Sequence, residues 1–218
     1  MTNRRDFFAR VAAGATALSG APALADQLAA LEPGQPAQGK WDGSWAERVT
    51  GKYRAAFDIP EISEGVGVFR ANVWYANYEE MYGAQAEEMT PVAVIRHAAV
   101  PMLMNDAFWA AYGYREQFKD KLGEMAGPGT GNPWMSVKYM GRDYGIQALL
   151  DRRCIILGCG LAFGGRIVAD VMRKDNLSRE AADAKARSYL LPGVTLQPSG
   201  IFAVARAQEL GCSYVWTI

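Results

Sequence analysis

The sequence predicts an α/β fold, a three-layer helix–sheet–helix arrangement around a mostly parallel sheet of about five strands. Short continuous apolar runs, typical of strands buried on both faces, alternate with helical patterns along most of the chain. Strands that alternate with helices pair in parallel through right-handed crossovers. The residues from 26 onward suit one domain that is large enough to bury a proper core.

The segment before the domain, residues 26–60, is expected to form a linker and docking arm. Its first half is rich in Gln, Ala, Gly and Pro, as linkers are. Trp41 and Trp45 suggest that the next part docks onto the body, and residues 48–57 are expected to be a short helix or irregular. The folded domain is then expected over residues 61–218.

The first half of this domain contains two expected strands. Residues 66–75 have the β-rich character of a first strand, and residues 91–97 form a cleaner apolar run. Between them, residues 78–88 are expected to be a helix with a glutamate-rich solvated face. Asn105 is expected to cap a further helix. Residues 121–139, rich in Gly and Pro, are expected to form a long loop insertion, which in compact domains is usually functional or disordered.

The second half of the domain continues the alternation. A helix over residues 142–152 is expected to lead into the apolar strand 154–158, which the helix 160–173 follows. The remaining expected elements are a helix over 178–189 capped by Ser178, a strand over 194–197, a helix over 201–209 ended by Gly211, and a strand over 213–218.

The charge balance argues against nucleic acid as a partner. The chain has 23 basic and 23 acidic residues, and no basic block concentrates the positive charge that backbone binding needs. The longest apolar stretch beyond the N-terminus, residues 154–163, is closed by Arg152, Arg153 and Arg166. Because a span needs about 20 apolar residues, we expect no stable membrane insertion of the mature chain.

The N-terminus has the pattern of a twin-arginine signal peptide. Arg4 and Arg5 precede two phenylalanines, and residues 11–24 are small or apolar. Ala23 and Ala25 provide the small residues that signal peptidase requires before the cleaved bond, so cleavage is expected after Ala25. Residues 1–25 are therefore expected to be the signal. The protein is then periplasmic or otherwise exported, with the twin-arginine translocon as its partner through the arginine pair. Retention of the signal as an anchor is the alternative.

The three cysteines do not suggest a disulfide framework. Cys154 and Cys159 flank a strand and face opposite sides of it, and the count leaves one thiol without an intrachain partner. Cys159 lies between a strand and a helix, where exposed helix amides favour a thiolate able to carry sulfur or to attack an electrophile. Cys159 is therefore the first catalytic candidate. The alternative is that it is a small buried hydrophobe.

His97 is the only histidine and the second, weaker catalytic candidate. It lies at the carboxyl end of the expected strand 91–97, at the edge of the sheet where ligands collect. The alternative is a structural hydrogen-bonding role. With one histidine and no characteristic spacing, the sequence predicts no metal site. The glycines around Cys159 resemble a loose form of a dinucleotide-binding turn. A dinucleotide-binding fold needs a second strand that ends in an acidic residue about 20 residues later, and a helix is expected there instead, so no cofactor is expected.

Three blocks of sequence resemble a known family. Residues 92–106, 157–162 and 191–214 are similar to exported proteins related to the DsrE/DsrF-like sulfur-relay domain, and the resemblance covers most of residues 64–218. It implies a helix–sheet–helix domain that assembles into homo-oligomers, usually trimers or hexamers. It also implies that Cys159 occupies the position that carries persulfide sulfur in active members.

Two functions are therefore expected, and the sequence leaves open whether the protein is an enzyme. The first is a periplasmic DsrE-like protein that carries sulfur as a persulfide, or acts in thiol redox chemistry, through Cys159. The alternative is a non-catalytic α/β module that binds a small ligand or a partner beneath the loop of residues 121–139.

Overall fold

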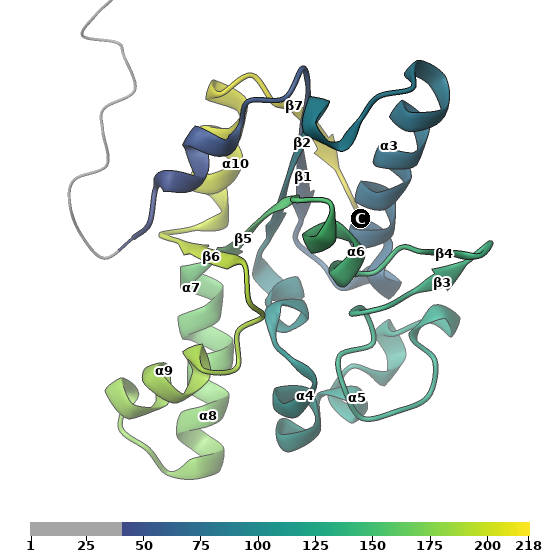
Figure 1. Cartoon of the computed structure of the whole chain (residues 1–218). Helices are drawn as coiled ribbons and strands as arrows, with labels where there is room; N and C mark the ends of the chain where they lie inside the picture. Colours follow the sequence, from purple (N-terminus) through teal and green to yellow (C-terminus); the bar gives the residue numbers. More distant parts are fainter. Residues whose placement is uncertain (1–40) are drawn as a thin grey trace, which may run out of the picture. The chain divides into compact units, whose positions relative to one another are not determined.

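The computed structural model describes residues 41–218, in which five parallel strands form one sheet in the order β6-β5-β2-β1-β7 (Figure 1). The expected α/β class with a helix–sheet–helix arrangement is confirmed. The strands are β1 (Tyr53–Ile59), β2 (Met89–Ile95), β5 (Ile155–Cys159), β6 (Val194–Gln197) and β7 (Ser213–Trp216). The expected signal and the first part of the arm lie outside the described residues.

Helices cover both faces of the sheet. The long helix α3 (Val66–Tyr82) and the shorter α6 (Ile146–Asp151) lie on one face, over the larger cluster of buried side chains. The other face is covered by α10 (Gly200–Glu209) and by the short helix η1 (Ser44–Arg48), which place Trp45 in the second cluster. Since α10 joins β6 to β7 at opposite edges of the sheet, it crosses the whole face and contacts all five strands.

A further group of helices lies beyond the carboxyl ends of the strands, in the lower half of Figure 1. They are α4 (Asp106–Tyr112), α5 (Tyr114–Gln117), α8 (Val168–Asp175) and α9 (Arg179–Arg187). The chain reaches α8 from β5 through α7 (Gly160–Ala162) and a turn of π-helix (Phe163–Ile167), so residues 160–175 form one continuous helical segment. Tyr114 of α5 ties this group together by donating its hydroxyl proton to Asp170, at 2.6 Å.

Two expectations for the first third of the domain are wrong. Residues 66–75, expected to be a strand, are the first half of α3, whose buried residues Val68, Ala71 and Tyr75 recur at helical spacing. Residues 53–59, expected to belong to the linker and docking arm, are the interior strand β1. The sheet therefore begins earlier in the chain than residue 61. Trp45 does dock as expected, with 1% of its surface exposed.

The later elements follow the expectation closely. Asn105 caps α4 by accepting the amide proton of Phe108, and Ser178 caps α9 by accepting that of Ala181. Gly211 follows α10 with a left-handed backbone, φ 83°. The expected helix over 142–152 is shorter, because Arg142 and Asp143 belong to a small hairpin and α6 begins only at Ile146.

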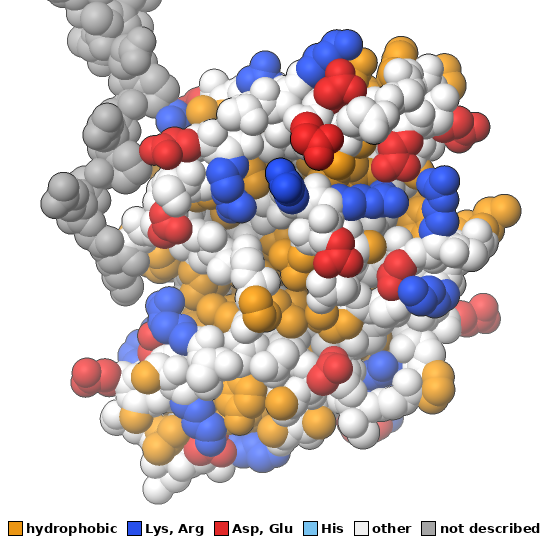
Figure 2. Space-filling view, in the orientation of Figure 1, with side chains coloured by type: hydrophobic (Ala, Val, Ile, Leu, Met, Phe, Trp, Pro, Cys, Tyr) orange, Lys and Arg blue, Asp and Glu red, His pale blue; other side chains and the backbone are white. Residues whose placement is uncertain are grey.

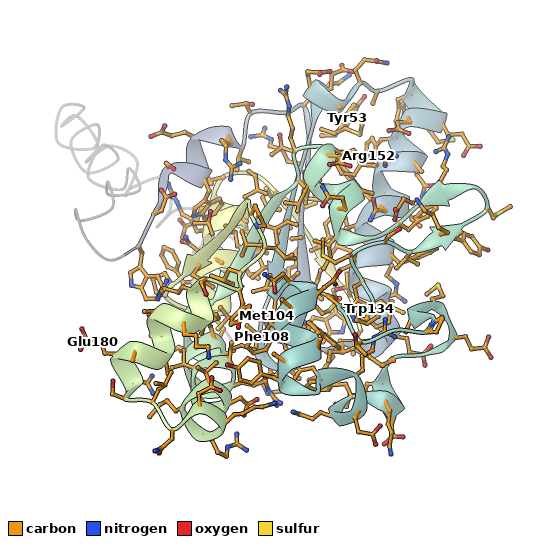
Figure 3. The ribbon with its side chains drawn as sticks, turned by 60° about the horizontal axis from the view of Figure 1, so that its bottom comes forward. Tyr53, Met104, Phe108, Trp134, Arg152 and Glu180 are labelled. Carbon is orange, nitrogen blue, oxygen red and sulfur yellow. The ribbon has the colours of Figure 1, made fainter. Side chains whose placement is uncertain are left out.

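The segment 121–139 is largely irregular and well packed. It holds the short helix η6 (Glu124–Ala126) and ends in β3 (Lys138–Tyr139), which pairs with β4 (Arg142–Asp143). Trp134, labelled in Figure 3, is 1% exposed and lies against Gly65, where a Cβ atom would come within 2.4 Å of its ring. Within residues 41–218, no helix has the length and apolar character needed to cross a bilayer.

Candidate functional site

One face of the sheet carries a row of polar residues near the carboxyl ends of its strands. Four strands provide a member at or next to their carboxyl ends: Gln197 from β6, Cys159 from β5, Arg96 after β2 and Asp58 from β1. The fifth member is Tyr214, the second residue of β7, whose hydroxyl reaches Asp58. We call this set the sheet-edge row.

The register places these five residues on the face covered by α10. Alternate residues of a strand share a face. Asp58, Arg96 and Cys159 each lie two positions after a member of the cluster buried beneath α10, and these members are Ala56, Val94 and Leu157 respectively. Cys159 is paired in register with Gln197, and Tyr214 is paired with Ala56 of the same cluster. The row therefore lies between the sheet and the start of α10.

An ion pair forms the centre of the row. Arg96 donates from Nε and Nη2 to the two carboxylate oxygens of Asp58, at 2.6 and 2.9 Å. The hydroxyl of Tyr214 donates to Asp58 Oδ2 at 2.9 Å. The Asp58 side chain is 4% exposed, and that of Arg96 is 24% exposed. This pairing satisfies a carboxylate that burial would otherwise make very costly.

Arg96 is also held by the start of α10. A Cβ atom at Gly200 would lie 2.5 Å from Cβ of Arg96, so a side chain at Gly200 would displace the arginine. The hydrogen bond to Asp58 raises the pKa of Arg96 against the opposing effect of burial, and the charges of Asp58, Tyr214 and Cys159 raise it further. The guanidinium therefore stays cationic. Because Ile95 is paired in register with Gly158, the residues that follow them, Arg96 and Cys159, are neighbours at the ends of β2 and β5.

Cys159 ends β5 and is the N-cap residue of the helical segment 160–175. Its Sγ accepts the amide proton of Ala162 at 3.4 Å. This amide belongs to the first helical turn, where N–H groups have no partner within the helix. The residue is 7% exposed. The sulfur of Cys159 thus lies at a helix N-terminus, next to the strand end that carries Arg96.

The other two cysteines have different surroundings. Burial raises the pKa of Cys154 to about 12, and its thiol donates to the carbonyl of Pro91. Burial also raises the pKa of Cys212, which packs in the cluster under α10. All three cysteines are free of disulfides. At neutral pH, Cys154 and Cys212 are therefore protonated, buried thiols.

Trp41 covers the backbone next to Cys159. Its ring would come within 2.6 Å of a Cβ atom at Gly160, the residue that follows the cysteine. The next residue is held in place as well, because Gln197 donates from Nε2 to the carbonyl of Asp42 at 2.8 Å. The glycine at 160 is needed for this close approach.

His97 belongs to a separate group on the same edge. Its Nδ1 lies 3.0 Å from Oε1 of Glu61, and its side chain is 70% exposed. Lys121 approaches the same carboxylate at 3.8 Å. His97 has a left-handed backbone, φ 50°, which is strained for a residue with a side chain. No interaction among the described residues joins His97 to Cys159, so the two candidates remain separate predictions.

Sequence reasoning missed the ion pair of the row. Asp58 was missed because β1 itself was not expected, and Arg96 was read only as part of an apolar strand. One signal was present in the sequence, since a single acidic residue stands between Phe57 and Ile59 in a short apolar run. A charge at such a position needs a partner when it is buried.

In the described part of the chain, no group of three His, Cys, Asp or Glu side chains is arranged to hold a metal ion. The sheet-edge row itself presents a sulfur, a phenol hydroxyl, a guanidinium, a carboxylate and a carboxamide. Neither a protein-family model nor a curated protein matches the sequence.

Proposed function

We propose that this protein is an exported sulfur carrier that holds sulfane sulfur as a persulfide on Cys159. The observation that carries the proposal is the position of the Cys159 sulfur, which accepts the Ala162 amide proton, while Arg96 is the neighbour of Cys159 across β2 and β5. A persulfide is more acidic than a thiol and is an anion at neutral pH. An amide donor and a cation stabilise a neighbouring anion, so these surroundings suit the loaded form.

The loading step needs no oxidant or reductant beyond the donor. The Cys159 thiol loses its proton to solvent, and the thiolate attacks the outer sulfur of thiosulfate. An S–S bond forms between Sγ and that sulfur while the original S–S bond breaks, and sulfite leaves with the electron pair. Attack by an acceptor thiolate on the outer sulfur of the persulfide then unloads the protein and restores the Cys159 thiolate.

The arrangement of the other cysteines supports a single carrier residue. Cys154 and Cys212 are both kept protonated by burial, whereas Cys159 is itself a member of the sheet-edge row. A protein without a second reactive thiol nearby does not resolve its persulfide into an internal disulfide. Such a protein is suited to carry sulfur and release it to a partner.

The proposal is tested by loading the purified protein with thiosulfate or inorganic polysulfide. Intact-protein mass spectrometry is expected to show the addition of one sulfur atom to the wild type and to the Cys154→Ser and Cys212→Ser variants. The Cys159→Ser variant is expected to stay unmodified. The proposal is wrong if the Cys159→Ser protein takes up sulfur as fast as the wild type while the other two variants behave normally.

A further inference from the structure

A second site lies on the far side of α3, away from the sheet-edge row. There α3 and the β3–β4 hairpin enclose an open pocket of about 480 Å³, within the range of small-molecule sites. On α3 the pocket is lined by Val73, Ala76, Asn77 and Glu80, which recur at helical spacing and so form one stripe of the helix. The hairpin supplies the opposite wall.

Aromatic side chains close one end of this stripe and leave the other end open. Phe69, one turn before Val73, stacks on Tyr144 with ring centroids 4.8 Å apart, and Tyr139 meets Phe69 edge-on at 5.5 Å. These contacts fix the Tyr144 ring as a wall of the pocket. Beyond it the small side chain of Ala76 leaves space that a larger residue would fill.

Met140 gives the pocket an exposed apolar rim. It occupies the two-residue turn of the hairpin with a left-handed backbone, φ 47°, and is 85% exposed. Turns of this kind favour asparagine or glycine, so an exposed methionine here is costly both in backbone strain and in apolar surface. Figure 2 shows hydrophobic surface projecting at the right edge of the molecule, where Figure 1 places the hairpin.

The charges around the pocket favour a cation. Among the residues that line the pocket, Glu79 and Glu80 carry carboxylates and Arg142 carries the one guanidinium. The Arg142 guanidinium lies 3.7 Å from the carboxylate of Glu79. Within residues 41–218, no cationic side chain lies within ion-pair distance of Glu80. An anionic ligand would meet two carboxylates, whereas an ammonium group would give Glu80 a partner.

From these walls we infer that the pocket binds a small amine with a flat apolar body. Its ring or chain would lie between Ala76 and Tyr144 under the rim of Met140, and its ammonium group would pair with Glu80. This site is independent of the sulfur chemistry proposed for Cys159, because no pocket-lining residue belongs to the sheet-edge row.

Three probes of nearly equal size separate charge from shape: phenethylamine, phenethyl alcohol and phenylacetate. Titrations of the wild-type protein, followed by NMR of its methionine methyl groups, are expected to show saturable binding of the amine. Because an exposed ion pair adds about 1 kcal/mol at most, the alcohol is expected to bind up to about fivefold more weakly. The phenylacetate is expected to bind most weakly of the three.

Two variants locate the binding site. Glu80→Gln is expected to reduce the affinity for the amine to that for the alcohol, and Ala76→Leu is expected to weaken all binding by filling the pocket. The matched control Glu87→Gln changes an exposed carboxylate outside the pocket and is expected to bind like the wild type, as is Cys159→Ser. The inference is overturned if the amine does not bind, if it binds no better than the alcohol, or if Ala76→Leu leaves its affinity unchanged.

Discussion

Arg96, which follows β2, donates hydrogen bonds to both carboxylate oxygens of Asp58 in the neighbouring strand β1. Replacing Asp58 with Asn leaves the half-buried guanidinium without its counter-charge. We expect a loss of about 3 kcal/mol in the free energy of unfolding, measured by urea denaturation. Tyr214→Phe removes only the third hydrogen bond of this group and is expected to cost about 1 kcal/mol. Equal losses in the two variants would contradict this account of the ion pair.

Trp41 limits access to the sheet-edge row. The Trp41 ring lies against Gly160, so Trp41→Ala is expected to raise the rate of alkylation of Cys159 at neutral pH by on the order of tenfold. This corresponds to about 1.4 kcal/mol in the free energy of exposing the sulfur. The readout is the modified peptide identified by mass spectrometry. Cys154 provides the internal control, because it is sealed in the core on the other face and its labelling rate is expected to stay unchanged. An unchanged rate at Cys159 would show that Trp41 does not shield the sulfur.

Asp143 organises the hairpin that forms one wall of the pocket. Although burial opposes it, hydrogen bonds from Ser136, Lys138 and the amides of Gly145 and Val137 hold the pKa of Asp143 well below its usual range. The folded-state pKa is lower than the unfolded one, which is about 3.9. The stabilisation is therefore fully present above about pH 4 and is lost as the pH falls through the lower, folded value.

Amide hydrogen exchange at Val137 and Gly145 tests the role of Asp143. In the wild type, protection of both amides is expected to persist at pH 4 and to decline only at lower pH. In Asp143→Ala the protection factors are expected to fall by on the order of tenfold, because a carboxylate hydrogen bond typically contributes about 1.5–3 kcal/mol. Loss of wild-type protection already between pH 5 and pH 4 would contradict this assignment.

The N-terminal arginine pair carries the export part of the proposal. Replacement of both Arg4 and Arg5 by Lys keeps the charge but removes the pair that the translocon recognises. The precursor of this variant is expected to accumulate in the cytoplasm of a bacterial host. The wild type is expected in the periplasm, cleaved after Ala25 so that Asp26 is its N-terminal residue. Equal export of the two proteins, measured by cell fractionation and N-terminal sequencing, would exclude the twin-arginine route.

The helices and strands that sequence predicted well are those whose local signals agree with their packing. β2 is a continuous apolar run and is buried along its whole length, and α9 has a Ser178 cap that the structure uses. α10 ends shortly before Gly211, as its glycine predicts. In each case the pattern along the chain is enough, because no distant residue is needed to define the element.

The elements that sequence missed depend on contacts made far along the chain. β1 contains an Ala pair and the charged residues Arg54 and Asp58, which argue against a buried strand until their partners are known. Those partners, Leu210 for Arg54 and Arg96 for Asp58, are distant in sequence. The start of α3 is rich in β-branched and glycine residues, and only the helical spacing of its buried side chains reveals the helix.

The candidate site was predicted only in part for the same reason. Cys159 could be selected because strand, cysteine and helix follow one another directly. The ion pair beside it could not, since it joins β1 to the end of β2 and is completed by Tyr214 near the end of the chain. Trp41 was expected to dock, but its position over Gly160 follows from the tertiary fold alone.

The most direct test of the central claim is to locate the added sulfur after brief exposure of the wild-type protein to thiosulfate at neutral pH. Persulfides are trapped with an alkylating reagent, and the three cysteine peptides are compared by mass spectrometry. The account predicts the trapped persulfide on the Cys159 peptide, with the Cys154 and Cys212 peptides unmodified. A persulfide distributed over all three peptides, or absent from the Cys159 peptide, would contradict it.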